Sequence, residues 1–202
     1  MSRRRPRGIL LIELIIAMGV ASLIGGIILG LNIDQLRLYR FAQERSEIEN
    51  STRLAIGRVI RIIRDAAPSN TGAFPILTAD AQTLTLFANI DADADVERVR
   101  FFLNGTLLQR GVIQPVGDPA VYLTANEVVS TVTTNVRNGA APVFEYFEET
   151  YLGSGSPLTQ PVDENDVRLV RMTLTVDVDP ASEPVASTLS TLTQLRNLKE
   201  NY

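Results

Sequence analysis

An alternating run of acidic residues is the part of this sequence whose spacing most directly suggests chemistry. Asp91, Asp93, Asp95 and Glu97 occupy every second position. Oxygen ligands that converge from alternate positions of a loop can surround Ca²⁺. The run lacks the glycine and the distal glutamate of an EF-hand loop, and a solvated turn before a strand is the alternative. We favour the turn and keep calcium as a candidate ligand of these four residues.

Two residue types that dominate catalytic and metal chemistry are absent from the sequence. The 202 residues include no histidine and no cysteine. The commonest general base, the commonest transition-metal ligand, thiolate metal sites and disulfides are therefore missing. No glycine-rich phosphate loop or other catalytic motif is visible. We therefore expect a protein that is not an enzyme and uses no cofactor.

The charges are distributed unevenly along the chain. The net charge is −4, yet Arg3, Arg4, Arg5 and Arg7 lie within the first eight residues with no acid among them. Removing these four of the 19 basic residues leaves 15 against 23 acidic residues. An acidic body argues against direct nucleic-acid binding, which needs clustered Lys and Arg. The basic N-terminus is typical of a segment that stays in the cytoplasm.

A long apolar stretch follows the basic residues. Residues 9–33 carry a single charge, Glu13. About 20 apolar residues suffice to span a bilayer as a helix, so this stretch is a candidate transmembrane segment. A secretory signal peptide is the alternative, but its shorter apolar core would end in a cleavage site followed by a loop.

The helical pattern continues beyond the apolar stretch. Apolar side chains and one threonine recur at steps of three, four or seven, at Phe41, Ile48, Thr52, Ile56, Val59 and Ile63. No proline occurs between Ile9 and Ala67, and Pro68 ends the pattern. We predict one helix over residues 9–66. Its first half, 9–33, is transmembrane, and its amphipathic second half, 34–66, packs on a globular head.

The rest of the chain, residues 67–202, has the character of a β-rich head. Asn104-Gly105 between two apolar runs predicts a hairpin turn. Residues 128–136 fit a strand or a helix. Leucines spaced by three over 189–198 fit a helix, but the Ser and Thr between them favour an exposed edge strand. We predict strands in the segments 83–87, 99–103, 106–109, 143–147 and 167–178. The predicted fold class is α+β, a long N-terminal helix packed on an antiparallel sheet.

The N-terminal segment has a recognisable arrangement. A short basic leader, residues 1–8, ends in Gly8, an apolar stretch begins at Ile9, and Glu13 lies five residues beyond the glycine. This arrangement resembles the cleavage and methylation motif of type IV prepilins and type II secretion pseudopilins. The resemblance implies that a prepilin peptidase cuts between Gly8 and Ile9 and that the new amino terminus, Ile9, is methylated. The family more often has phenylalanine at the position of Ile9.

Glu13 has a physical reason to need a partner. A charged carboxylate deep in a membrane segment costs a few kcal/mol, so it is rarely retained without one. The family resemblance implies that the partner is the new amino terminus of a neighbouring subunit, an ion pair that sets the register of assembly. The alternative is a hydrated Glu13 at the cytoplasmic interface with no such role.

The head also resembles this family, less specifically. Residues 101–108 followed by Arg110, the Phe-Glu-Tyr-Phe of 144–147, and the terminal Leu-Arg-Asn of 195–197 are similar to minor pilins W and pseudopilins J.

Together the resemblances imply a structural minor pilin that initiates, caps or modifies a type IV pilus-like filament. A pseudopilin of a type II secretion or DNA-uptake system is one alternative, and a membrane-anchored ligand-binding domain that never polymerises is another. The implied partners are other pilins or pseudopilins, prepilin peptidase, an inner-membrane assembly platform and membrane lipid. The implied location is a single-pass membrane protein with a cytoplasmic N-terminus and the head outside, later part of a pilus or pseudopilus.

Overall fold

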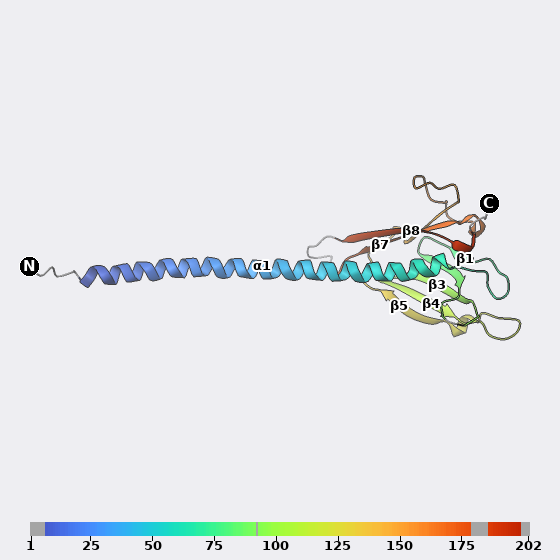
Figure 1. Cartoon of the computed structure of the whole chain (residues 1–202), viewed down its shortest axis with the longest axis horizontal. Coiled ribbons are helices and arrows are strands. Elements are labelled where there is room, and N and C mark those ends of the chain that lie inside the picture. The colour runs from blue at the N-terminus through green and yellow to red at the C-terminus, as the bar shows by residue number, and fades with distance from the viewer. Residues whose placement is uncertain (1–6, 92, 179–185, 199–202) are drawn as a thin grey trace, which may run out of the picture. The chain divides into compact units, whose positions relative to one another are not determined.

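The structure, a computed structural model, describes residues 7–91, 93–178 and 186–198 (Figure 1). Within helix α1, the side chains of residues 7–10, 28–34, 36–38, 40–41 and 44 lie outside this description. Contacts divide the chain into two compact units, Met1–Glu47 and Ile48–Tyr202. Each unit is described by itself.

Helix α1 extends from Arg7 to Arg64. Its end follows from the sequence, because Pro68 disfavours helical geometry in the residue before it. Arg61 and Arg64 lie in the last turn, where positive charge is favourable next to the negative end of the helix dipole. The Asp65 N–H donates to the carbonyl of Arg61 at 3.0 Å, which closes the final turn. The predicted helix, residues 9–66, differs from these bounds by two residues at each end.

The transmembrane interpretation of residues 9–33 requires correction. Among the residues that the structure describes, no helix combines the length and the apolarity needed to cross a bilayer. The transmembrane part of the predicted fold class and the predicted single-pass membrane location are therefore wrong.

The first sheet has five strands in the order β1-β2-β3-β4-β5, and every neighbouring pair is antiparallel. Each strand therefore follows its predecessor as a meander. The strands are β1 Ile76–Ala79, β2 Thr83–Ala88, β3 Glu97–Asn104, β4 Leu107–Ile113 and β5 Val128–Thr133. The ambiguous segment 128–136 is thus a strand over most of its length.

A second antiparallel sheet has three strands in the order β6-β7-β8. Its strands are β6 Phe144–Phe147, β7 Leu169–Val176 and β8 Ser187–Gln194. β8 lies at an edge, so the expectation of an edge strand near the C-terminus is confirmed. Short 3₁₀ helices occupy η1 Thr124–Asn126, η2 Glu164–Asp166 and η3 Arg196–Leu198.

The prediction of one sheet is wrong, and the connection after β5 explains why. Asn135 has a φ of 60°, a left-handed conformation that turns the chain out of the first sheet. Val136 then forms an isolated antiparallel bridge with Val176 at the end of β7. The chain therefore leaves the first sheet beside β7, and β6 pairs with β7 instead of with β5.

The hairpin between β3 and β4 is present, but its turn is displaced by one residue from the predicted position. Asn104 pairs with Leu107 as the last residue of β3, which leaves Gly105 and Thr106 as the turn. Gly105 has a φ of 61°, whereas Thr106 is not among the positive-φ residues. A glycine first in the turn fits a type II′ hairpin instead of the type I′ that Asn-Gly favours.

The core of the second unit joins the end of α1 to both sheets. Ile56, Val59 and Ile63 of α1 belong to one buried cluster with Phe101 of β3 and Met172 of β7. β7 alternates strictly between half-buried and buried positions, as a strand with one face on a core does. Full burial of each such side chain contributes about 1.5–3 kcal/mol. One face of α1 between residues 48 and 64 is therefore part of the core.

Candidate functional site

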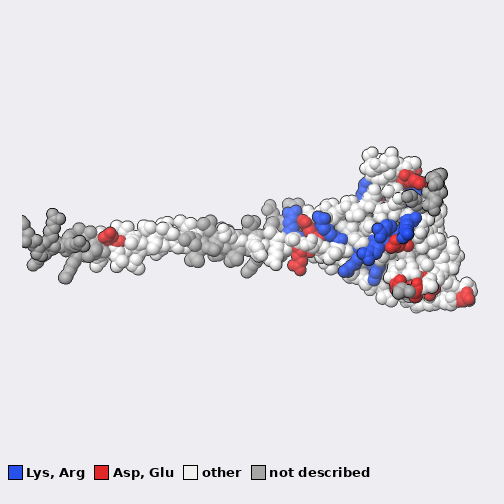
Figure 2. Space-filling view, in the orientation of Figure 1, with Lys and Arg blue, Asp and Glu red and all other residues white. Residues whose placement is uncertain are grey.

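The first candidate site is the apolar surface of α1 in the unit Met1–Glu47. Ten large apolar side chains in this stretch are between 51% and 66% exposed. They are Leu11, Ile12, Leu14, Ile15, Ile16, Met18, Val20, Leu23, Ile24 and Ile27. In Figure 2 the described surface of residues 11–27 is white except for one acidic group.

These side chains surround the helix instead of forming a stripe. Successive residues of an α-helix are about 100° apart, so Leu14, Ile15 and Ile16 point in three different directions. A helix that is apolar on all sides is normally buried. The surface therefore has the composition of a protein core. Within the described part of its own unit, however, no contacts cover these side chains.

Glu13 lies within this apolar surface and is exposed. It is the single charged residue among residues 11–27. The predicted cleavage residues, Gly8 and Ile9, belong to the first turn of α1. Both lie outside the residues whose side chains the structure describes. Cleavage and methylation there stay predictions.

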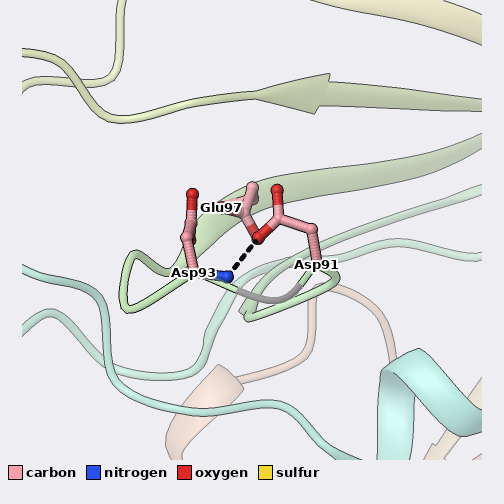
Figure 3. Close-up of side chains that lie close together, drawn as sticks. All are labelled: Asp91, Asp93 and Glu97. Atoms are coloured by element: carbon pink, nitrogen blue, oxygen red, sulfur yellow. Dashed lines mark hydrogen bonds between the residues drawn. The ribbon is translucent and has the colours of Figure 1, made fainter.

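The second candidate site is the acidic loop, defined as residues 89–97 between β2 and the start of β3. Carboxylate oxygens of Asp91, Asp93 and Glu97 all lie within 4.8 Å of one another (Figure 3). Asp95, the fourth residue of the sequence run, is not part of this group. Its Oδ1 instead accepts a hydrogen bond from Asn70 Nδ2 at 2.7 Å.

Local hydrogen bonds explain why this sequence folds into a tight loop. Asp91 Oδ1 accepts from the Asp93 N–H at 3.1 Å, and Asp93 Oδ1 accepts from the Asp95 N–H at 2.9 Å. Aspartates commonly bond to the backbone two residues later in this way. Asn89 Nδ2 also donates to the Asp93 carbonyl at 2.7 Å. The alternating acids therefore build the loop as well as lining it.

Glu97 differs from the two aspartates because it is fully buried, at 0% exposure. Its Oε2 accepts from the Ile90 N–H at 2.9 Å. Its Oε1 is buried and has no hydrogen-bond partner among the described residues. Burial raises the pKa of Glu97, and the negative charges of Asp91 and Asp93 raise it further.

The pKa of Asp91 shifts in the opposite direction. The hydrogen bond from the Asp93 N–H is the main cause that lowers the pKa of Asp91. A second contribution comes from Gln114 Nε2, which donates to Asp91 Oδ2 at 3.2 Å. The charged form of Asp91 is thus supported by the loop and by the residue that follows β4.

Residues from distant segments hold the acidic loop in place. Asn70, which follows α1, bonds to Asp95 and also accepts from the Val96 N–H at 2.8 Å. The Tyr122 hydroxyl donates to the Val96 carbonyl at 2.6 Å. Sequence reasoning missed Asn70, Gln114 and Tyr122, because they lie 23 to 26 positions from their partners and carry no motif.

Comparison with known proteins found no family model that matches this chain and no curated protein that matches it. The acidic loop and the apolar surface of α1 are therefore interpreted from their own chemistry.

Proposed function

We propose that this protein is a structural subunit of a type IV pilus-like filament, a minor pilin or pseudopilin that initiates, caps or modifies assembly. The observation that carries the proposal is the surface of α1 between residues 11 and 27, apolar on all sides and exposed. Such a surface requires a cover, and equivalent helices of neighbouring subunits would supply one. The prepilin-like arrangement of Gly8, Ile9 and Glu13 supports the same function.

The free energy available from burying this surface agrees with assembly through it. Covering the exposed half of one of these side chains would contribute about 1 kcal/mol, so covering all ten would contribute about 10 kcal/mol. Association costs an estimated 4–15 kcal/mol in lost freedom of motion. The two quantities are similar, and one neighbour can cover only one side of the helix, so a single neighbour would bind weakly. Stable assembly would need several neighbouring helices around α1, as in a filament.

Small residues in α1 are compatible with close helix packing. A Cβ added at Gly19, Gly25 or Gly26 would meet no atom within 4 Å. Contacts within the chain therefore do not require glycine at these positions. Glycine would allow the helix of another subunit to approach the backbone closely.

Glu13 would set the register of this packing. Covering the surrounding apolar side chains removes water from the carboxylate, and an unpaired buried charge is strongly unfavourable. A counter-charge on the neighbour is therefore required. The amino terminus of Ile9 in an adjoining, processed subunit would provide it. The helices would then pair at one stagger instead of sliding along an apolar surface.

Pilus, secretion and DNA-uptake filaments use the same kind of helix packing in this proposal. The exposed α1 surface favours all three over a binding domain that never polymerises, because only assembly would cover the apolar side chains. The identity of the neighbouring genes would distinguish the three systems.

Crosslinking in cells that assemble the filament tests the proposal. The chain has no cysteine, so Ile16→Cys introduces a single thiol into the full-length protein. We expect oxidation to join it to a filament subunit that carries a cysteine in its own N-terminal helix. Ser154→Cys, in an exposed loop of the other unit, is the position control. Absence of an adduct from Ile16→Cys would refute the filament proposal.

A second comparison tests Glu13 separately. In the Ile16→Cys background, Glu13→Leu should reduce the adduct several-fold, because the helix loses the charge that sets its register. Glu47→Leu removes another exposed acid of α1 outside the apolar stretch and should leave the adduct unchanged. Equal adduct in all three proteins would show that assembly does not depend on the carboxylate of Glu13.

A further inference from the structure

In the part of the chain that the structure describes, the acidic loop gathers negative charge without a positive partner. Asp91, Asp93 and Glu97 hold carboxylate oxygens within 4.8 Å of one another. Among the described residues, none of the three forms an ion pair with Lys or Arg. Carboxylates this close repel one another when all are ionised. The ionised carboxylates of the loop therefore repel one another unless a cation lies between them.

Glu97 supplies an independent indication that a ligand binds here. Its side chain is completely buried, and Oε2 is satisfied by the Ile90 N–H, but Oε1 has no partner among the described residues. A buried polar atom without a partner costs about 1–3 kcal/mol, and more when it carries charge. In Figure 3 the Glu97 side chain lies in the space between Asp91 and Asp93. A cation in that space would satisfy Oε1.

The remaining lone pairs of the loop suffice for coordination. Asp91 and Asp93 each use Oδ1 to accept a backbone N–H, and Asp91 Oδ2 accepts from Gln114. Each carboxylate oxygen has about two acceptor positions, so these bonds leave room for a metal–oxygen contact. The same hydrogen bonds hold the aspartates in place before any cation binds.

We propose that Asp91, Asp93 and Glu97 form a Ca²⁺ site between β2 and β3. All three donors are hard oxygen ligands, which excludes a preference for soft transition metals. Ca²⁺ tolerates irregular geometry and accepts additional oxygens from water or backbone carbonyls. Mg²⁺ demands a near-ideal octahedron and gives up its water reluctantly. A short loop with three carboxylates, one of them buried, fits the larger ion better.

Binding at this site would stiffen more than the loop itself. The segment that carries Asp95 and Val96 is bonded to Asn70, and Val96 is bonded to Tyr122. The cation would therefore brace the connection that follows α1 and the segment between β4 and β5. This role goes beyond the proposed filament function and does not depend on it.

Thermal unfolding of the full-length protein tests the site, with Ca²⁺ itself as the probe. After treatment with EDTA, about 1 mM CaCl₂ should raise the melting temperature by several degrees, since a ligand that binds only the native state stabilises it. The same concentration of MgCl₂ should produce a smaller shift. The double variant Asp91→Asn, Asp93→Asn changes two exposed residues and should abolish the Ca²⁺ response. Asp166→Asn, another exposed acid, should retain it.

Glu97→Gln provides the second test of the same site. Its amide oxygen can still accept from Ile90, but the carboxylate charge is lost, so calorimetry should show Ca²⁺ affinity at least about tenfold weaker. Without Ca²⁺ this variant should be at least as stable as the parent, because the carboxylate repulsion is relieved. No Ca²⁺-dependent shift up to about 10 mM, or an unchanged shift in either variant, would overturn the proposal. An equal response to Mg²⁺ would overturn the assignment to calcium.

Discussion

Arg100 on β3 donates two parallel hydrogen bonds to Glu127, the residue immediately before β5. Arg100 Nε lies 2.9 Å from Glu127 Oε1, and Arg100 Nη2 lies 2.6 Å from Oε2. The guanidinium carbon is also 3.9 Å from the ring centroid of Phe102. Strand β4 lies between β3 and β5, so this pair ties two strands that are not neighbours.

Glycine at position 111 makes room for the pair. Gly111 of β4 is opposite Arg100 on one side and Val129 on the other. A Cβ at Gly111 would lie 2.1 Å from Glu127 Oε1 and 2.6 Å from Cδ. No side chain can therefore share this space with the Glu127 carboxylate. The Arg100–Glu127 ion pair therefore depends on glycine at position 111.

The first prediction is a pH dependence of stability that originates at Glu127. The hydrogen bonds from Arg100 lower the pKa of Glu127 below its ordinary value. The resulting stabilisation is complete above about pH 4.3, the ordinary pKa of Glu. It is lost as the pH falls through the lowered pKa of the folded state, because the unfolded chain then binds more protons. Urea unfolding of the parent and of Glu127→Gln at pH 7 and pH 3 measures it.

The expected difference between parent and Glu127→Gln is about 1 kcal/mol at pH 7, the upper end for a partly exposed pair. It should shrink toward zero at pH 3. A difference that is the same at both pH values would show that Glu127 contributes through packing instead of charge.

The second prediction is that Gly111→Ala destabilises the protein through Glu127. The new methyl group displaces the carboxylate, so we expect a loss of about 1–2 kcal/mol in unfolding free energy. In a Glu127→Ala background the same change should cost much less. The coupling in this double-mutant cycle is the measured quantity. Gly57→Ala is the control, because its Cβ meets nothing within 4 Å and alanine favours the helix by about 0.5–1 kcal/mol.

The third prediction concerns Asn138, a buried side chain that replaces a missing strand. Its Oδ1 accepts from the Thr175 N–H at 2.8 Å, and its Nδ2 donates to the Thr173 carbonyl at 2.8 Å. β6 pairs with β7 only from Leu169 to Met172, so this part of β7 lacks a strand partner on that side. Asn138→Ala would leave both backbone groups unpaired and should cost about 2–4 kcal/mol.

The measurement for Asn138→Ala is the free energy of unfolding in urea, combined with hydrogen exchange at Thr175. We expect the Thr175 amide to exchange faster in the variant than in the parent. Asn165→Ala, at an exposed position, is the matched control. Unchanged protection of the Thr175 amide would contradict the role assigned to Asn138.

Local patterns predicted the elements of this fold better than their arrangement. Alternation over residues 83–87 and 167–178 marked β2 and β7, and Pro68 marked the end of α1. The division into two sheets depends on Asn135 in a left-handed conformation and on the Val136–Val176 bridge. Neither feature has a periodic signal, because both depend on contacts about 40 positions apart. The predicted membrane span over residues 9–33 was also wrong, because among the described residues no helix has the length and apolarity that crossing a bilayer requires.

The candidate sites were likewise predicted in their local pattern but not in their three-dimensional contacts. The acidic run was visible as spacing, but the burial of Glu97 was not predicted. A signal was present, since Glu97, Val99 and Phe101 alternate along β3 and all three are buried. The alternation places Glu97 on the core face, where a carboxylate requires a partner. By contrast, nothing local pairs Arg100 with Glu127, because β4 and its flanking loop separate them in the sequence.

The last prediction concerns processing at the N-terminus. If the protein is a pilin-like subunit, the chain isolated from cells with an active prepilin peptidase should begin at Ile9 and carry one added methyl group. Gly8→Val should block the cut, because such a peptidase site needs a residue without a bulky side chain. Intact-mass spectrometry measures both results.

Ile9→Phe introduces the residue that the family more often has there and should be cleaved at least as well as the parent. Glu13→Leu should also be cleaved, because the carboxylate lies beyond Ile9 and acts later, in assembly. A parent chain that begins at Met1 or Ser2 would contradict the filament proposal, even if α1 associates with other helices.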